Sequence, residues 1–334
     1  MSEGVESFRL GTQPVGEAAE VAQGIYQLKV PVPFPLVFVS AYLVAGDDGW
    51  TIIDTGFDYP EGRQAWEAGT RQIGLDLDRD LARIVVTHFH PDHLGAARWL
   101  QGRSGAPVYM LESEIPHARE VWEVRDPSAF VEHLVRNGMD RASAEEAAAR
   151  MRANLALPDE MLPLWDGEKV DLGAATGRVI HAPGHADHQI MLYDEECRVL
   201  FAADHVLLEI TPNVGLWPDT DPEPLARYLE SLSGLRGAHE TDLVLPGHGP
   251  LFHDLDGRIV ELLQHHEERL DLMQGTLGDR PRTAFDVSRE VFRYALSLYE
   301  RCFALAEVLA HMEHLVSTGR AERIEDGTVG FRRA

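Results

Sequence analysis

Three histidines and an aspartate lie within six consecutive positions, at His88, His90, Asp92 and His93. The apolar run 84–86 precedes them, which predicts a loop at the end of a β-strand. Imidazole and carboxylate groups are ligands for borderline and hard divalent metals. Residues two apart on an extended loop point to the same side, so His88 and His90 can share one ion. Asp92 and His93 can then reach a second ion beside the first.

Further candidate ligands follow apolar runs elsewhere in the chain. His185 comes after the run 178–181, Asp204 after 198–203 and His248 after 242–245. An aspartate, Asp54, closes another such run in the first half. With the loop of His88, five strand ends are therefore expected to converge on one edge of the fold, and core packing does not explain that pattern.

The order and contexts of these motifs resemble the metallo-β-lactamase superfamily of binuclear metallohydrolases, over about residues 21–255. The resemblance implies an α/β fold, an αβ/βα sandwich of two β-sheets flanked by helices. It also implies two divalent metal ions, with Zn²⁺ favoured and Mn²⁺ or iron fitting the same ligands. It gives Asp54 a supporting role beside the metal-binding loop. One ion would be held by His88, His90 and His185 and the other by Asp92, His93 and His248, with Asp204 bridging the two.

The chemistry implied is hydrolysis by a metal-bridging hydroxide, with Asp92 and Asp204 as the carboxylates of the catalytic site. A bound dication lowers the pKa of water from 15.7 to about 7, so hydroxide is available as a nucleophile near neutral pH. The expected substrate is a small or medium molecule with an ester, thioester or lactone bond. Two alternatives stay open: a phosphodiesterase or ribonuclease of the same superfamily, and an iron-dependent oxidoreductase similar to persulfide dioxygenases.

Several other histidines need an interpretation. The segment 184–189 departs at Ala186 from the Gly-His-Thr of glyoxalase II, which weakens that assignment. His188 could contact the substrate, although a structural or exposed role is favoured. His205 is expected to point away from the site. Four histidines on C-terminal helices are expected to be solvated: His265, His266, His311 and His314.

The elements that must position these residues can be predicted from patterning. Residues 1–20 form an N-terminal tail or an edge strand, and strands at 25–30, 37–44 and 49–54 form an antiparallel meander. A second group of elements is helical: 61–73, 92–100, 112–125, 128–137 and 142–155. The last three make residues 112–165 a helical insertion in a catalytic domain spanning 21–255.

The C-terminal residues 256–334 predict helices at 257–275, 283–299 and 302–318, followed by a hairpin at 321–331. This arrangement looks like the winged-helix-like module of some superfamily hydrolases. The insertion and this module are expected to shape the substrate pocket. Candidate wall residues, fewer than half of which should face the site, are Phe34, Trp122, Phe130, Leu134, Met151, Leu155, Met161 and Leu162.

The charge balance bears on partners. Among 334 residues, 30 Lys plus Arg stand against 55 Asp plus Glu, a formal charge of −25, which disfavours nucleic acid. The terminal arginines, Arg320, Arg323, Arg332 and Arg333, are interspersed with acidic residues. No signal-peptide pattern or apolar run near the roughly 18 residues of a membrane span is present. A cytoplasmic enzyme without a membrane partner is expected, and a homodimer stays open.

Overall fold

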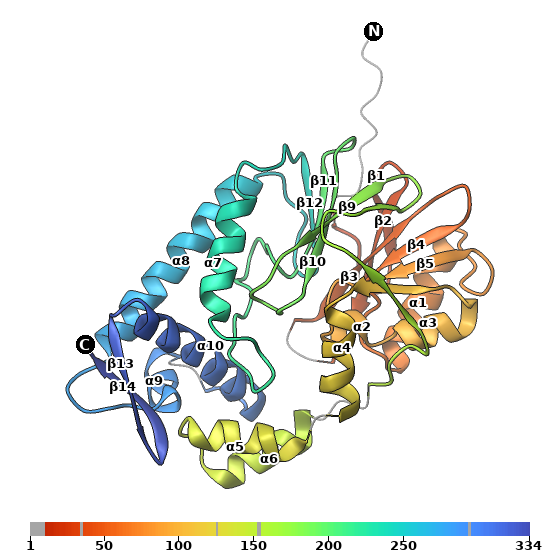
Figure 1. Cartoon of the computed structure of the whole chain (residues 1–334). Helices are drawn as coiled ribbons and strands as arrows, with labels where there is room; N and C mark the ends of the chain where they lie inside the picture. Colours follow the sequence, from red (N-terminus) through yellow and green to blue (C-terminus); the bar gives the residue numbers. More distant parts are fainter. Residues whose placement is uncertain (1–10, 34–35, 125, 152–154, 293–294) are drawn as a thin grey trace.

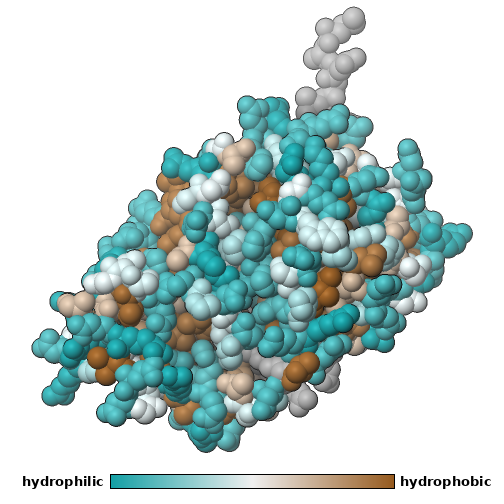
Figure 2. All heavy atoms as spheres, in the orientation of Figure 1, coloured by the Kyte–Doolittle hydropathy of each residue, from teal (hydrophilic) through white to brown (hydrophobic). Residues whose placement is uncertain are grey.

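The computed structural model of the chain describes residues 11–33, 36–124, 126–151, 155–292 and 295–334. Two β-sheets pack face to face and helices cover their outer faces (Figure 1). This arrangement confirms the predicted αβ/βα sandwich. On the face shown in Figure 2, hydrophilic residues prevail, and apolar residues come in small groups between them. Within the described residues no helix is long and apolar enough to cross a membrane.

The first sheet has seven strands in sequence order. The predicted meander is present, and the edge strand suggested for the end of the tail begins at Ala18. From β4 onward neighbouring strands run parallel. The strands are β1 (Ala18–Ala22), β2 (Ile25–Pro31), β3 (Phe38–Val44), β4 (Trp50–Ile53), β5 (Leu81–Val85), β6 (Val108–Leu111) and β7 (Met161–Leu164).

The second sheet has the strand order β12-β11-β10-β9-β8. Its strands are β8 (Lys169–Asp171), β9 (Thr176–His181), β10 (Ile190–Asp194), β11 (Val199–Ala203) and β12 (Leu243–Pro246). The apolar inner faces of the two sheets form one core, in which Ile53 and Val85 meet Phe201 and Leu245. Strand β10 is wholly buried, and the sequence patterning did not predict it.

Helices complete the outer layers. Helices α1 (Pro60–Gln72) and α3 (Ala97–Ser104) lie against the seven-stranded sheet, while α7 (Pro224–Leu235) and α8 (Leu255–Gly275) lie against the five-stranded sheet (Figure 1). The buried indole of Trp66 ties α1 to the site end of β4, because its N–H donates to the carbonyl of Thr55 at 2.7 Å.

The predicted insertion is mostly helical but packs as part of the body. It contains α4 (Glu114–Arg119), a π-helix (Glu120–Val124), α5 (Pro127–Arg136) and α6 (Arg141–Met151). Helices α5 and α6 lie beside the C-terminal helix α10 (Leu298–Ser317) in Figure 1. Leu134 of α5 shares a buried cluster with Cys302 and Leu305 of α10. The insertion and the C-terminal helices therefore form one wall.

Two helix predictions were wrong in their bounds. The C-terminal helices are α9 (Ala284–Val291) and α10, because Ser297 and Glu300 form a capping box that begins α10 at Leu298. The predicted helix 92–100 is divided into α2 (Pro91–Leu94) and α3. The amide of Ala96 donates to the carbonyl of Gly56 at 2.9 Å, which interrupts the helix between the two pieces. The terminal hairpin is present as β13 (Ala321–Asp326) and β14 (Thr328–Arg333).

The prediction that the C-terminal histidines are solvated was wrong for His266 and His311, which are buried, and the side chain of His314 is only 16% exposed. His266 on α8 is 3% exposed and His311 on α10 is fully buried, because these helices face each other at these positions. The Nδ1–H of His311 donates to the carbonyl of Glu307 at 2.7 Å. Its Nε2 then accepts from Nδ1 of His266 at 3.1 Å. Burial lowers the pKa of His266 to about 2 and that of His311 to about 3.

This pair predicts a loss of stability in mild acid. Both groups titrate near 6.5 in the unfolded chain and stay neutral when folded, so the unfolded state binds the extra protons as pH falls below about 6.5. The cost is about 2 kcal/mol per histidine at pH 5. In urea unfolding from pH 7 to pH 5, the double variant His266→Leu/His311→Leu should lose less stability than wild type. The exposed His253→Leu serves as control, and equal slopes for all three proteins would refute the assignment.

Candidate metal centre

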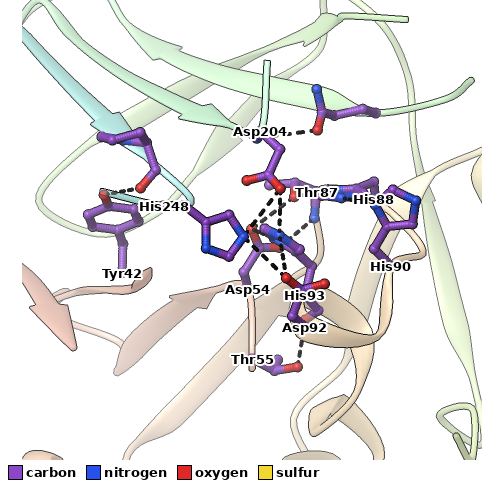
Figure 3. Close-up of polar contacts among 12 residues, drawn as sticks. Tyr42, Asp54, Thr55, Thr87, His88, His90, Asp92, His93, Asp204 and His248 are labelled. Atoms are coloured by element: carbon purple, nitrogen blue, oxygen red, sulfur yellow. Dashed lines mark hydrogen bonds and ion pairs between the residues drawn. The ribbon is translucent and has the colours of Figure 1, made fainter. Parts of the chain in front are cut away.

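All seven predicted ligands meet at one end of the sandwich, between the two sheets. Strand register explains the meeting. Ile53 of β4 pairs with Val85 of the parallel β5, so Asp54 and the loop of His88 leave the first sheet side by side. Phe201 of β11 pairs with Leu245 of the parallel β12, so Asp204 and His248 do the same in the second sheet. In Figure 3 the carboxylate of Asp204 points toward His93 and Asp92.

The potential ligand atoms form three overlapping groups, each with its atoms within 4.8 Å of one another. These are His88 with His90 and His185, His88 with His93 and Asp204, and Asp92 with His93 and His248. The overlap shows that the groups are parts of one cluster.

Distances place Asp204 between two halves of this cluster. On one side, Nδ1 of His90 lies 3.0 Å from Nε2 of both His88 and His185. On the other, Nε2 of His248 lies 3.2 Å from Oδ2 of Asp92. Oδ2 of Asp204 is 3.6 Å from Nε2 of His185 and 3.3 Å from Nε2 of His248.

Three of the imidazoles are oriented by oxygen atoms on their outer side. Nδ1–H of His185 donates to the carbonyl of Asn213 at 2.9 Å, and Nδ1–H of His248 donates to the carbonyl of Phe38 at 2.9 Å. Nδ1–H of His93 donates to Oδ2 of Asp54 at 2.8 Å. A carbonyl or carboxylate oxygen only accepts, so the proton is on Nδ1 and each Nε2 faces inward.

His88 is held in the same way through a hydroxyl relay. The hydroxyl of Thr87 donates to Oδ2 of Asp54 at 2.8 Å, so its oxygen is free to accept from Nδ1 of His88 at 3.0 Å. Oδ1 of Asp54 also accepts the backbone N–H of Thr87 at 2.8 Å. Asp54 thus orients two histidines while belonging to none of the three groups itself.

Two residues beside the ligands have a strained backbone. Asp54 has φ 60° and Ala203, which precedes Asp204, has φ 46°, both in the left-handed region that is costly for residues other than glycine. Gly247 lies against the centre, where an added Cβ would be 2.2 Å from Oδ1 of Asp204. Only glycine fits beside that carboxylate.

The electrostatics of the cluster fit a cation. Burial lowers the pKa of His90 to about 3, so its imidazole stays neutral. Burial also opposes protonation of His248, but the carboxylates of Asp204 and Asp92 raise its pKa to about 10. Without a metal, His248 would therefore carry a proton that a dication can replace.

Buried polar atoms without hydrogen-bond partners also indicate that the cluster can bind a cation. Among the described residues, the buried atoms without a hydrogen-bond partner include Nε2 of His93 and Oδ1 of Asp204. Buried polar atoms are rarely left so, and these belong to side chains that meet in one cluster. Nitrogen and carboxylate donors in this number suit Zn²⁺, Mn²⁺ or iron.

Two adjoining hollows lie over the cluster. A chamber of about 400 Å³ is lined by His90, Asp92, His185, Asp204 and His248, with Leu36 at its rim. A side pocket of about 260 Å³ adjoins it. Both hollows share Trp217 and the α10 residues Tyr299 and Phe303 as walls.

The wall prediction was confirmed for two residues, Trp122 and Phe130, which line the side pocket. The others with described side chains line neither hollow: Leu134, Leu155, Met161 and Leu162. Phe34 and the side chain of Met151 lie outside the described residues. Sequence reasoning missed Trp217, Tyr299 and Phe303. The four-residue spacing of Tyr299 and Phe303 on one helix face was the available signal.

Two further histidines near the ligands lie apart from the cluster. His188 sits between His117 and His181, with ring centroids 5.6 and 6.2 Å away, and lines neither the chamber nor the side pocket. His205 is buried, and its Nε2 lies 3.0 Å from the hydroxyl of Ser231.

Three of the four arginines named in the terminal hairpin region are paired with acidic residues. Arg320 contacts Glu267 at 2.9 Å and Asp271 at 2.5 Å. Arg323 pairs with Glu313 at 2.9 Å and also with Glu325, and Arg332 pairs with Glu322 at 2.5 Å. These carboxylates offset the positive charge that a nucleic-acid surface would need.

Comparison with known families gives two matches. Residues 34–248 match the family model described as the metallo-beta-lactamase superfamily. Residues 270–334 match the model described as the metallo-beta-lactamase-like C-terminal domain. The first match spans the five strand ends of the site, and the second includes Tyr299 and Phe303 on α10.

Individual proteins resemble the chain over most of its length. It is 26% identical to the probable metallo-hydrolase YqjP of Bacillus subtilis, covering 88% of this chain and 92% of that one. It is 22% identical to the atrochrysone carboxyl ACP thioesterase of Passalora fulva, covering 90% and 75%. A solved metallo-beta-lactamase family protein of Thermus thermophilus is 33% identical with a TM-score of 0.85, covering 94% and 100%.

Proposed function

Because the chain belongs to the metallo-β-lactamase superfamily of hydrolases, we propose that it uses two divalent metal ions to cleave an ester, thioester or lactone bond. Three side chains hold one ion and three hold the other, with Asp204 shared between them. Zn²⁺ is favoured, and Mn²⁺ or iron fits the same donors. The proposed ligands are His88, His90 and His185 for the first ion, and Asp92, His93 and His248 for the second.

The observation that carries this proposal is the inward orientation of the imidazoles. Oxygen atoms hold the outer nitrogens of His88, His93, His185 and His248, so their Nε2 atoms aim at the interior of the cluster. Such outer partners fix the tautomer and the ring plane of a metal-binding histidine. In a polar core that binds no ion, nothing would require these four Nε2 atoms to converge.

The residues of the chain then divide the work. Bound ions would supply a Lewis acid and an activated water. The carboxylates of Asp92 and Asp204 face the interior of the cluster, where the ions would bind, and would balance the positive charge of those ions. The chamber of about 400 Å³ admits a small or medium substrate to the ligands, and helix α10 forms one of its walls. Preorganised ligands keep their places while the substrate enters.

The carbonyl substrate class has support from the relatives. The Passalora fulva protein is named a thioesterase, and a thioester carbonyl is open to attack by the same chemistry. A phosphodiesterase or ribonuclease is the second candidate, since the same ligands can serve at phosphorus. The net charge of −25 and the paired arginines of the hairpin disfavour it.

A panel assay tests the proposal. The full-length protein should hydrolyse some of a set of 4-nitrophenyl esters, acyl thioesters and lactones, lose that activity on chelation, and regain it when Zn²⁺ or Mn²⁺ is added back. Single-stranded RNA and DNA should not bind tightly at about 0.15 M salt. Metal-dependent cleavage of RNA or of a phosphodiester, with no turnover of any carbonyl substrate, would contradict the proposal in favour of the second candidate.

A further inference from the structure

The side pocket beside the chamber is walled by aromatic rings from four separate segments. Phe89 lies between two of the candidate ligands, and Trp122 and Phe130 belong to the insertion. Trp217 precedes α7, and Tyr299 and Phe303 belong to α10. All six rings line the pocket: Phe89, Trp122, Phe130, Trp217, Tyr299 and Phe303. Aromatic side chains therefore make up much of the wall of this pocket, although they come from distant parts of the sequence.

The pocket opens onto the reacting end of the chamber. His90 and Pro91 line both hollows, so a group in the side pocket would have its attached carbonyl near His90. Trp217, Tyr299 and Phe303 are also shared by both. A substrate can therefore lie across the two hollows, with one end in each.

The aromatic walls are held in place by hydrogen bonds. The indole N–H of Trp122 donates to the carbonyl of Phe89 at 2.9 Å, and the N–H of Phe89 donates to Oε1 of Glu114 at 2.6 Å. Glu114 is fully buried, and burial raises its pKa to about 8. The insertion thus clamps the loop between His88 and His90 and fixes Trp122 as a wall.

On the opposite side the rings pack against one another. Phe130 and Trp217 are stacked with an interplanar angle of 17° and centroids 6.1 Å apart. Trp217 meets Phe303 edge to face at 5.2 Å, and Phe303 lies 4.7 Å from Tyr299. A surface of packed rings favours a planar aromatic guest, because stacked and edge-to-face contacts are then available on several sides.

The volume and the charge of the side pocket limit further which groups it can bind. A dry apolar cavity of roughly 150 Å³ accommodates one benzene ring, so about 260 Å³ leaves room for two fused rings. The described residues that line the pocket include Glu123 and Asp219 and no Lys or Arg. The carboxylate of Glu123 would repel an anionic group, while an uncharged ring is not repelled. Asp219 instead faces His117, with its Oδ2 3.9 Å from Nε2 of that histidine.

We propose that the side pocket binds the uncharged aromatic part of the acyl group of the substrate, up to about two fused rings, and so selects aromatic acyl esters or thioesters. The proposal deepens the hydrolase function above and rests on it for the site of cleavage. Binding of the ring itself depends only on the pocket, so the two can be tested apart.

Binding of a ketone that cannot be hydrolysed tests the pocket directly. Quenching of tryptophan fluorescence by 2-acetylnaphthalene should saturate with the full-length protein. The variants Phe130→Leu and Phe303→Leu keep an apolar side chain but remove a ring, and each should raise the Kd by about 10-fold. The matched control Phe285→Leu should leave the Kd unchanged, since Phe285 packs in the same cluster as Phe130 but does not line the pocket.

Turnover gives the second readout. For 4-nitrophenyl 2-naphthoate, kcat/KM should fall about 10-fold in both pocket variants. The fall should be smaller for 4-nitrophenyl acetate, which has no ring to place in the pocket, and Phe285→Leu should leave both values close to wild type. The charged ester 4-nitrophenyl 4-carboxybenzoate should be a poorer substrate than 4-nitrophenyl benzoate. This comparison uses kcat/KM divided by the rate constant for uncatalysed hydrolysis of the same ester by hydroxide. Equal Kd values for the ketone in wild type and both pocket variants would overturn the pocket proposal. Saturable, ring-dependent ketone binding without turnover of any ester or thioester would support the pocket and overturn the hydrolase.

Discussion

Hydrolysis should fall by about three orders of magnitude or more when Asp204 is replaced by alanine. Among the residues that the structure describes, Asp204 is the one carboxylate between both halves of the cluster, 3.6 Å from His185 and 3.3 Å from both His93 and His248. Without it the two ions would lose their shared ligand, and their mutual repulsion would be uncompensated. The measurement is kcat/KM on the best substrate of the panel.

A buried aspartate elsewhere in the same sheet provides the control. Asp194 is 2% exposed and caps a turn by accepting the N–H groups of Glu196 and Cys197. Asp194→Ala should lower stability but keep kcat/KM close to wild type at a temperature where the protein is folded. Near-normal activity of Asp204→Ala, with the fold intact by circular dichroism, would show that the ligand assignment is wrong.

Replacement of Asp54 by asparagine should weaken metal binding by about 10- to 100-fold. One oxygen of Asp54 accepts from His93 and from the Thr87 hydroxyl, and the other accepts the Thr87 N–H. An asparagine amide has one oxygen, so its NH₂ group must face a donor on one side or the other. If it faces His93, the imidazole changes tautomer and its Nε2 can no longer bind a metal.

Competition with a chromogenic chelator measures this affinity for each variant. Activity of Asp54→Asn should return toward wild type at high metal concentration, which a misfolded variant would not show. The control is Asp58→Asn, the same change four residues away, where the exposed carboxylate pairs with Arg63 at 2.6 Å. Unchanged metal affinity in Asp54→Asn would refute the orienting role.

The site could be predicted better than the elements between its parts. Only a few residue types bind metal ions well, and a ligand that follows an apolar run can be recognised from the local sequence alone. Strand β7 was missed because Pro163 within it argues against a strand, yet β7 is at the sheet edge, where a proline is tolerated. Strand β10 was missed because a short apolar run without alternation has no clear period.

The buried histidine pair and the aromatic pocket had no comparable signal. Helix α10 is covered by the insertion, α7 and α8, so a polar residue such as His311 becomes buried by packing that only the tertiary fold reveals. Trp122, Trp217 and Phe303 come from distant parts of the sequence and meet through the same packing. Local patterning contains neither fact.

Metal content of the purified full-length protein, together with anomalous diffraction at the metal edges, tests the central claim most directly. We expect close to two ions per chain, one among His88, His90 and His185 and the other among Asp92, His93 and His248, with Asp204 in contact with both. A single iron at saturating metal, with the Asp92, His93 and His248 position empty, would contradict a binuclear hydrolase and favour an iron-dependent oxidoreductase.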